Sequence, residues 1–508
     1  MDIVDYAPRG RVPTRKADSL AFVVNELSGS QPSLVYANRP TDAEKIAQGL
    51  RRYGSSQQSG ESIRRTILAI REYVHEDYSL TECLADGVGF HYSAMPDVAR
   101  LAVEDLFESG ELRYVACTST LLEGVNFPAK NVFVSYPRQG RSTPMTDSAF
   151  WNLAGRAGRL LKEFAGNVYC VDQEKWERPV AERSRDYDLQ SAFEVAVEEP
   201  SFVQYLTTTE SVESKRAETF SNVVNSILLR SRTEDEGLLS GYLSQRIPSL
   251  GADRRSEVVE QITRIRSGLS LDMDIVARNR SIDARIQDEA FKGLMHMSRE
   301  EIQAYVPVNP NDTERFFDRL ASLFRFVAES LGVGTAARNR YIALLANRWI
   351  HENTLRAMIA DQLDYARRDA RSKGLTPELD IDDQIRTLIR DIEDQLRFTL
   401  VKGSKCAMDL IEHAFELRGW GKVPGLDQGL ASYLELGMFR PATITLHNLG
   451  LSRTTAIVSA NWARGRGVRE DGIVRWLVAN VQAADASLPR PSARELQKLL
   501  SSNVALPV

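Results

Sequence analysis

Residues 87–119, GVGFHYSAMPDVARLAVEDLFESGELRYVACTS, place two short apolar runs on either side of a longer amphipathic stretch. GVGFHYS and LRYVACTS have the length and composition of buried strands. DVARLAVEDLFESG between them is predicted to be a helix, because Pro96 suits a first helical turn. Strands joined by a crossover helix pair in parallel within one sheet. This stretch therefore predicts an α/β fold.

The same alternation extends over residues 19–175. Further strands are predicted in SLVYA, NVFVSY and NVYCVD, at residues 33–37, 131–136 and 167–172. The capping box of residues 41–44, TDAE, predicts the start of one helix. A second helix is predicted from apolar residues at helical spacing, Ile63, Ile67, Ile70 and Val74. The expected fold class is an α/β parallel-sheet domain followed by a mostly helical region.

The composition changes near residue 176, where helical patterns such as residues 315–331 and 380–401 begin to dominate. Gly- and Pro-containing segments separate them. The predicted domains are an entry linker and an α/β domain, followed by a helical region and a C-terminal helical domain, with bounds 1–18, 19–175, 176–400 and 401–508.

Charge and cysteine usage limit the classes of function. The 508 residues carry a net charge of −5, so a nucleic-acid site must be a local groove and not a global basic field. The four cysteines form no CxxC pair, which indicates a reduced intracellular protein without a structural metal cluster. No signal peptide and no membrane-length apolar run is present, and the expected location is cytoplasmic, without a membrane partner.

Residues 149–172, AFWNLAGRAGRLLKEFAGNVYCVD, place two arginines three positions apart. If residues 148–160 are helical, Arg156 and Arg159 lie on one face, where two guanidiniums suit a polyphosphate. Gly155 and Gly158 would let another surface approach. The alternative is two surface arginines near a glycine turn.

Residues 118–128, TSTLLEGVNFP, follow a predicted strand. The hydroxyl and N–H groups of Thr118 and Ser119 can hold a phosphate, Gly124 permits close approach of a ligand, and Asn126 suits a ribose hydroxyl. A plain strand–loop–strand connection is the alternative. These segments and YANRP at residues 36–40 are all expected at the sheet edge where ligands bind in open parallel sheets.

Together, GVGFHYSAMP, TSTLLEGVNFPA and NLAGRAGR resemble, in order and spacing, motifs of the second RecA-like lobe of Ski2-like superfamily 2 helicases. The resemblance covers roughly residues 20–175. It implies that Arg156 and Arg159 are arginine fingers for the γ-phosphate of ATP. The nucleotide contacts that it implies are Gly124, Asn126, Asn152 and Gly155. The implied contacts to nucleic acid are Asn38, Arg39, His91, Ser93, Thr118 and Ser119. Two departures are Asn152, where the family has Gln, and Tyr92, where it has a second His.

The first lobe of such a helicase supplies a phosphate-binding loop, GxxxxGK[ST], and an acidic strand end for Mg²⁺. Gly421–Lys422 lacks the rest of the loop motif, and DEAF at residues 288–291 is predicted to be a solvated helix face. ATP and Mg²⁺ are therefore expected to bind mainly to a missing lobe, in cis or in trans. The chain alone is expected to be inactive as an ATPase.

Three further segments have open interpretations. Residues 137–146, PRQGRSTPMT, form either a short strand-separating pin or a loop, and the loop is favoured. The helix over residues 337–359 is expected to bury Tyr341, Leu344, Leu345 and Trp349 and to expose its arginines, although it could also pack on a nucleic-acid strand. Gly450 and Ser452 lie in GLSRTTA, which resembles a helix-hairpin-helix that binds phosphate through backbone N–H groups, or is a turn capped by Ser452.

The predicted function is the C-terminal half of an ATP-dependent helicase or translocase that acts on single-stranded or partly duplex nucleic acid. The alternatives are a non-catalytic nucleic-acid-binding subunit and a truncated helicase that acts with a partner chain.

Overall fold

The computed structural model describes residues 12–29, 31–53, 60–119, 129–140, 143–158, 166–177, 191–208, 214–230, 236–334, 336–376, 379–423, 425 and 429–501. The chain forms two compact units. Unit 1 comprises Met1–Arg185, Asn353–Arg390 and Arg440–Val508. Unit 2 comprises Asp186–Glu352 and Asp391–Phe439. The domain bounds predicted from composition stay a prediction, because the units follow contacts in space and not continuous stretches of chain.

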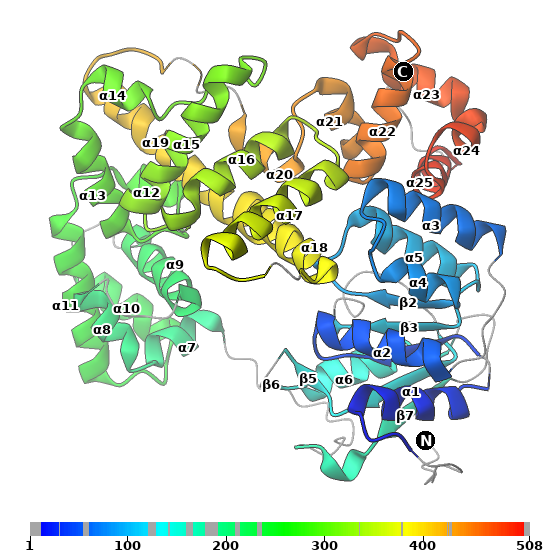
Figure 1. Cartoon of the computed structure of the whole chain (residues 1–508). Helices are drawn as coiled ribbons and strands as arrows, with labels where there is room; N and C mark the ends of the chain where they lie inside the picture. The colour runs from blue at the N-terminus through cyan, green and yellow to red at the C-terminus, as the bar shows by residue number, and fades with distance from the viewer. Residues whose placement is uncertain are drawn as a thin grey trace. The chain divides into compact units, whose positions relative to one another are not determined.

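Unit 1 is built on a five-stranded sheet of order β2-β3-β1-β4-β7, in which every neighbouring pair is parallel (Figure 1). The strands are β1 (Ser33–Tyr36), β2 (Val88–His91), β3 (Tyr114–Cys117), β4 (Asn131–Ser135) and β7 (Asn167–Val171). The α/β fold and all five predicted strands are confirmed. Cys117 pairs in register with both Tyr36 and His91, so β1, β2 and β3 end together at one edge.

Helices flank this sheet. They are α1 (Lys16–Leu27), α2 (Pro40–Tyr53), α3 (Glu61–Tyr73), α4 (Leu80–Ala85), α5 (Asp97–Glu108), α6 (Asp147–Ala154) and η2 (Gln173–Lys175). Helix α5 connects β2 to β3 and buries one apolar face, as the sequence predicted. Helix α2 begins at Pro40, and Glu44 does not act as the acidic member of a capping box. Its carboxylate instead accepts hydrogen bonds from Tyr92 and Arg386.

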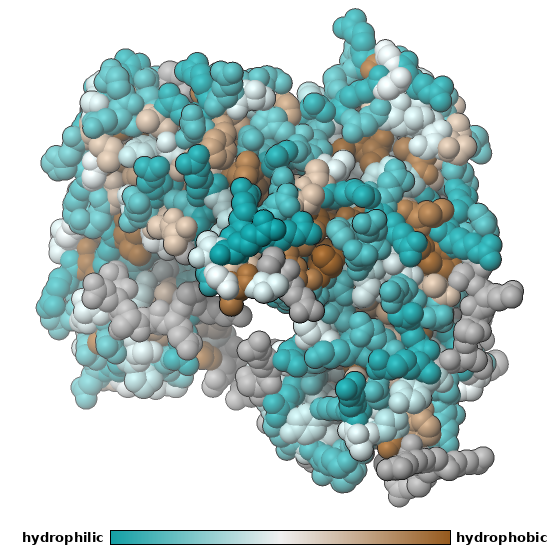
Figure 2. Space-filling view, viewed as in Figure 1, coloured by the Kyte–Doolittle hydropathy of each residue, from teal (hydrophilic) through white to brown (hydrophobic). Residues whose placement is uncertain are grey.

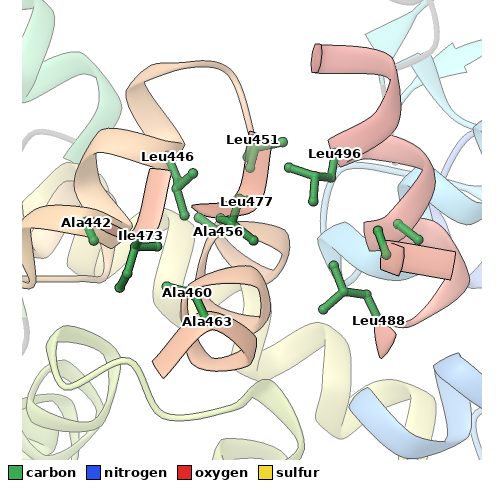
Figure 3. Packing of buried hydrophobic residues seen from close by; sticks show 12 residues of the cluster. Ala442, Leu446, Leu451, Ala456, Ala460, Ala463, Ile473, Leu477, Leu488 and Leu496 are labelled. Carbon is green, nitrogen blue, oxygen red and sulfur yellow. The ribbon is translucent and has the colours of Figure 1, made fainter. Parts of the chain in front are cut away.

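Unit 1 also contains helices from far along the chain. They are α17 (Leu355–Ser372), α18 (Ile381–Arg390), α21 (Pro441–Asn448), α22 (Arg453–Arg464), η6 (Glu470–Gly472), α23 (Ile473–Asn480), η7 (Val481–Ala483), α24 (Ala484–Ser487) and α25 (Arg490–Ser501). Helices α21 to α25 share a core that includes Leu446, Leu451, Leu477 and Leu496 (Figure 3). Helix α25 packs against α3 and α5, so this core continues onto the α/β domain.

Unit 2 is helical in its described residues, which confirms the predicted helical texture. Its elements are α7 (Ala192–Glu198), α8 (Ser201–Thr207), α9 (Ser214–Arg230), α10 (Glu236–Arg246), α11 (Ala252–Gly268), α12 (Met273–Arg278), α13 (Ala284–Met295), α14 (Arg299–Gln303), α15 (Thr313–Ser330), η3 (Ala336–Arg338), α16 (Asn339–Ile350), η4 (Asp391–Leu400), α19 (Val401–Leu417) and α20 (Leu430–Leu436). Helix α19 crosses α15 closely at Gly403, where a Cβ atom would lie 2.4 Å from a methyl carbon of Val327.

Two sequence predictions for unit 2 need correction. In α16, Leu345 and Trp349 are buried as predicted, but Leu344 is 41% exposed because it lies on the opposite side of the helix. DEAF is helical, but Asp288 is buried and accepts hydrogen bonds from Ser270 and Leu271. The segment is therefore not a solvated face.

No helix in the described ranges is both long and apolar enough to cross a membrane. Hydrophilic residues cover most of the molecular face shown in Figure 2, with smaller hydrophobic patches between them.

Candidate nucleic-acid and nucleotide contacts

The ends of three neighbouring strands bring most of the predicted nucleic-acid contacts to one edge of the sheet. Asn38 and Arg39 follow β1, Ser93 follows β2, and Thr118 and Ser119 follow β3. Because β3 lies between β2 and β1, these residues form one row along the carboxyl edge. Ser93 is exposed, whereas Thr118 is largely buried.

Arg39 is the cation of this row. Its Nε and Nη2 atoms each donate to the carboxylate of Asp42 at 2.9 Å, and its side chain is still 43% exposed. The bidentate pair fixes the guanidinium at the first turn of α2. The remaining exposed N–H groups can reach a phosphate at the edge.

Asn38 forms hydrogen bonds within unit 1, and its contact with nucleic acid stays a prediction. Its Nδ2 atom donates to the carbonyl of Tyr136 at 3.1 Å, and its Oδ1 atom accepts from the backbone N–H of Arg138 at 2.9 Å. The Tyr36 hydroxyl donates to the carbonyl of Arg138 at 2.7 Å. These bonds tie the end of β1 to the segment that follows β4.

That segment is a small hairpin and not the loop that was favoured from the sequence. Strands β5 (Arg138–Gln139) and β6 (Thr143–Pro144) pair antiparallel. Arg138 contacts Glu177 through an ion pair and lies over the ring of Tyr136, 4.9 Å from its centroid. The anchored side chain stiffens the base of the hairpin, while Arg141 lies outside the described residues. A strand-separating function of this hairpin stays a prediction.

His91 and Tyr92 lie inside unit 1. His91 is 2% exposed and its Nε2 atom is 3.0 Å from a carboxylate oxygen of Glu104. The Tyr92 hydroxyl donates to Glu44 at 2.6 Å, and its ring stacks on Phe90. The burial favours a structural role for His91, and Tyr92 in place of a second His is explained by its buried partner.

The condition that residues 148–160 are helical is not met, because α6 ends at Ala154 and Gly155 follows as its C-cap. Residues beyond it form a turn in which Gly158 has a φ of 101°. The N–H of Gly158 donates to the carbonyl of Ala129 at 2.7 Å, and the carbonyl of Arg156 accepts from the N–H of Ala129 at 3.2 Å. Arg156 is therefore held on a turn and not on a helix face. Arg159 lies outside the described residues.

This turn lies at the opposite edge of the sheet from the nucleic-acid row. Ala129 precedes β4, so Arg156 lies beside the amino end of that strand. The five residues of β4 separate the two edges by roughly 16 Å at about 3.3 Å per residue. The expectation that all the motifs share one edge is wrong. The geometry instead allows Arg156 to contact a nucleotide phosphate at the amino edge and the polar row to contact a nucleic-acid strand at the carboxyl edge.

Only some of the other predicted nucleotide contacts lie within the described residues. Asn152 is exposed on the last turn of α6 and precedes Gly155 and Arg156 by one helical turn. Gly124 and Asn126 lie outside the described residues. Gly166 packs against this turn, since a Cβ atom at that position would lie 2.2 Å from the carbonyl carbon of Ala157.

The segment between α21 and α22 has the glycine turn of a helix-hairpin-helix, but the N–H groups at the start of α22 have partners within unit 1. Gly450 has a φ of 110° between α21 and α22, and Ser452 caps α22 by accepting from the N–H of Thr455 at 3.3 Å. The Ser452 N–H donates to Glu495 at 2.6 Å, and the Thr454 N–H donates to Asp97 at 3.1 Å. The N-terminal donors of α22 are thus used within unit 1, and this does not favour a phosphate at Gly450 and Ser452.

The structure around Gly421–Lys422 and around Asp288 does not support an ATP-binding motif at either place. Gly421 and Lys422 follow α19 without a preceding strand, and Asp288 accepts hydrogen bonds within unit 2. Within the described ranges, no group of three or more His, Cys, Asp or Glu side chains could hold a metal ion. Of the nucleotide contacts that the motifs imply, Asn152, Gly155 and Arg156 lie within the described residues.

Part of the chain is similar to Ski2-like superfamily 2 helicases, which confirms the resemblance seen in the motifs. Over 160 residues it is 32% identical to the ATP-dependent DNA helicase Hel308 of Methanocella arvoryzae, covering 30% of this chain and 22% of that protein. Over 141 residues it is 32% identical to Anti-bacteriophage protein B of Escherichia coli, covering 28% of this chain and 19% of that protein. Over 110 residues it is 35% identical to Hachiman protein HamB of Bacillus cereus, covering 22% of this chain and 10% of that protein.

The matched part of the chain thus spans about a fifth or less of the length of these relatives. No model of a known protein family matches the chain. The similarities support a helicase-related function.

Proposed function

We propose that this chain supplies the second RecA-like lobe of an ATP-dependent superfamily 2 helicase or translocase. The carboxyl edge with Arg39, Ser93 and Ser119 holds a nucleic-acid strand. Arg156 and Arg159 act as arginine fingers on ATP that is bound, with Mg²⁺, mainly by another lobe. The observation that carries the proposal is the row of polar residues at the ends of three neighbouring parallel strands.

The separation of the two edges supports a coupled mechanism. A strand and a nucleotide can be bound at once, because their contacts do not compete for the same surface. Arg156 stabilises charge on the transferring phosphoryl group when the lobes close. Reopening after hydrolysis then moves the row at the carboxyl edge along the strand. A non-catalytic nucleic-acid-binding subunit would use only the carboxyl edge.

The proposed contact between the carboxyl edge and a nucleic-acid strand is tested by fluorescence anisotropy of the purified chain with labelled single-stranded DNA and RNA at several salt concentrations. Arg39→Gln is expected to weaken binding and to reduce the slope of log affinity against log salt by about 0.7. Arg64→Gln, an exposed arginine on α3, is the matched control. Equal salt slopes for the two variants would contradict a phosphate contact at Arg39.

The ATP contact is tested in two steps. The purified chain alone is expected not to hydrolyse ATP, and robust ATPase activity abolished by Arg159→Ala would contradict a missing lobe.

The native protein is then isolated from its cell through a peptide of residues 149–172. Its mass shows whether the other lobe is in the same polypeptide or in a partner. In that assembly Arg156→Ala is expected to lower ATP turnover by about 10³-fold or more, whereas unchanged turnover would favour the binding subunit.

The biological setting that we propose is defence against bacteriophages, since one of the named relatives is called Anti-bacteriophage protein B. Deleting the gene from its host is expected to raise the plating efficiency of phages, and a copy with Arg156→Ala is expected not to restore resistance. Unchanged plating across a broad phage panel would contradict this setting without affecting the proposed chemistry.

A further inference from the structure

Unit 2 contains a cavity of about 550 Å³ between α7, α9, α10 and the end of α12. Its lining includes two aromatic rings, Phe193 and Tyr242, and three arginines. The arginines are Arg230 at the end of α9, Arg246 at the end of α10, and Arg280 just after α12. Unit 2 has no role in the proposed function, so this cavity needs a separate explanation.

The charge of the cavity points to an anion. Arg230 lies over the ring of Tyr242 at 5.4 Å and Arg246 over the ring of Phe193 at 6.0 Å. Arg280 donates from Nε to the carbonyl of Ala277 at 3.3 Å. Among the residues that the structure describes, none of the three arginines forms an ion pair with a carboxylate, and the lining contains no acidic side chain. All three guanidiniums line one space and are exposed to solvent, so their N–H groups are accessible to a phosphate, which guanidinium groups bind through paired hydrogen bonds.

The aromatic rings point to a planar group beside that anion. Phe193 and Tyr242 meet edge to face, with centroids 6.3 Å apart and an angle of 75° between the rings. Both rings line the cavity, and both have an arginine over one face. Aromatic and guanidinium planes are the surfaces on which nucleobases stack. The volume lies within the range of about 300–1,000 Å³ that is usual for small-molecule sites.

We propose that this cavity binds a nucleoside phosphate. Arg230, Arg246 and Arg280 hold the phosphate, and the base stacks against Phe193. The nucleotide is either a free one or the 5′-phosphorylated end of a strand, and both present the same chemistry to the cavity. The site is separate from the turn that carries Arg156 and from the carboxyl edge of unit 1. The proposal is therefore independent of the proposed helicase function.

The test is isothermal titration calorimetry of the full chain with AMP, with a 5′-phosphorylated trinucleotide of deoxyadenosine, and with its 5′-hydroxyl form. The double variant Arg246→Gln/Arg280→Gln is expected to bind AMP or the phosphorylated trinucleotide at least tenfold more weakly than the wild type. Arg278→Gln is the matched control, because Arg278 is exposed on α12 and does not line the cavity. Equal thermal unfolding midpoints show that the variants are folded.

The probes separate the two sources and the role of the rings. AMP that binds as tightly as the phosphorylated trinucleotide supports a free nucleotide, and a trinucleotide preference that needs the 5′-phosphate supports a strand end. Phe193→Leu is expected to weaken AMP but not inorganic pyrophosphate. Arg39→Gln in unit 1 is expected to leave AMP binding unchanged. The proposal is overturned if the wild type binds neither probe, if the double variant matches Arg278→Gln, or if Phe193→Leu leaves AMP binding unchanged.

Discussion

A buried ion pair joins two helices of unit 1 that are far apart in the chain. Arg386 of α18 is 2% exposed and donates from Nη1 to both carboxylate oxygens of Glu44 on α2. Tyr92 donates its hydroxyl to the same carboxylate, and Asp383 accepts from Nη2 of Arg386 at 3.0 Å. Removing one partner of a buried pair leaves an uncompensated charge, which costs more than the pair contributes.

Arg386→Met is therefore expected to lower the free energy of unfolding of unit 1 by about 3–5 kcal/mol. Replacing Glu44 by Gln as well should recover part of this loss, because the isolated carboxylate is removed. Urea unfolding of both variants measures the coupling. Arg390→Met is the control, because Arg390 lies one turn further along α18 and is exposed. Equal losses from Arg386→Met and Arg390→Met would show that the pair is not the cause.

Asp288 gives unit 2 a dependence on pH. Burial alone would raise the pKa of Asp288, but hydrogen bonds from Lys292, Ser270 and Leu271 outweigh it and lower the pKa below its ordinary value. A lowered carboxyl pKa in the folded state stabilises the protein above the unfolded-state pKa of about 3.9. This stabilisation is lost as the pH falls through the folded-state pKa.

Asp288→Asn is expected to lower the free energy of unfolding of unit 2 by about 2 kcal/mol at neutral pH, because Ser270 and Leu271 lose a charged acceptor. The difference from the wild type should shrink as the pH falls below about 4. Thermal unfolding at a series of pH values measures both effects. Glu289→Gln, at the exposed neighbouring position, should show neither. A gap between wild type and variant that persists at low pH would contradict the assignment to the Asp288 charge.

At the scale of elements, the turn after α6 explains the two glycines of GRAGR. Gly155 ends the helix with a φ of −63°, whereas Gly158 has a φ of 101° and donates its N–H to Ala129. Only the second glycine needs a conformation that other L-residues avoid. The turn fixes the backbone of Arg156 against the start of β4.

Gly158→Ala is accordingly expected to destabilise unit 1 by about 1–2 kcal/mol, because a left-handed conformation then carries a Cβ atom. Gly155→Ala, at a right-handed position, should change the free energy of unfolding by less than about 0.5 kcal/mol. Chemical unfolding of the two variants gives the comparison. Similar effects at both positions would mean that the conformation of Gly158 is not what requires glycine there.

The strands and most helices could be predicted because their signals are local. The apolar runs at residues 88–91 and 114–117 and the spacing of apolar residues in α3 are properties of short windows. The sequence leaves open whether residues 148–160 continue as a helix or turn at the glycines, because the bond from Gly158 to Ala129 joins positions that are far apart in the chain. The contacts of Asn38 and Glu44 could not be predicted either, since their partners Tyr136 and Arg386 come from distant positions that no local pattern indicates.

At the scale of the whole molecule, the packing of residues 440–501 on the α/β domain could not be predicted from any stretch of sequence. Arg490 of α25 is 5% exposed and donates from Nη1 to Asp105 of α5 at 3.0 Å and to Thr66 of α3 at 3.3 Å. Asp97, at the start of α5, accepts from Thr454 of α22. These partners are more than 350 residues apart, and only the folded unit brings them together.

Arg490→Gln is expected to destabilise unit 1 as a whole by about 3 kcal/mol, because Asp105 loses its buried cation. Hydrogen–deuterium exchange should then accelerate in α3 and α5 as well as in α25, since the three helices unfold as one cooperative body. Arg475→Gln, at an exposed position of α23, is the control and should leave all three unchanged. If exchange accelerated in α25 alone, the C-terminal helices would be a separate domain that only rests on the α/β domain. The long-range ion pair would then stabilise the contact between them and not the sheet that carries the strand and nucleotide contacts.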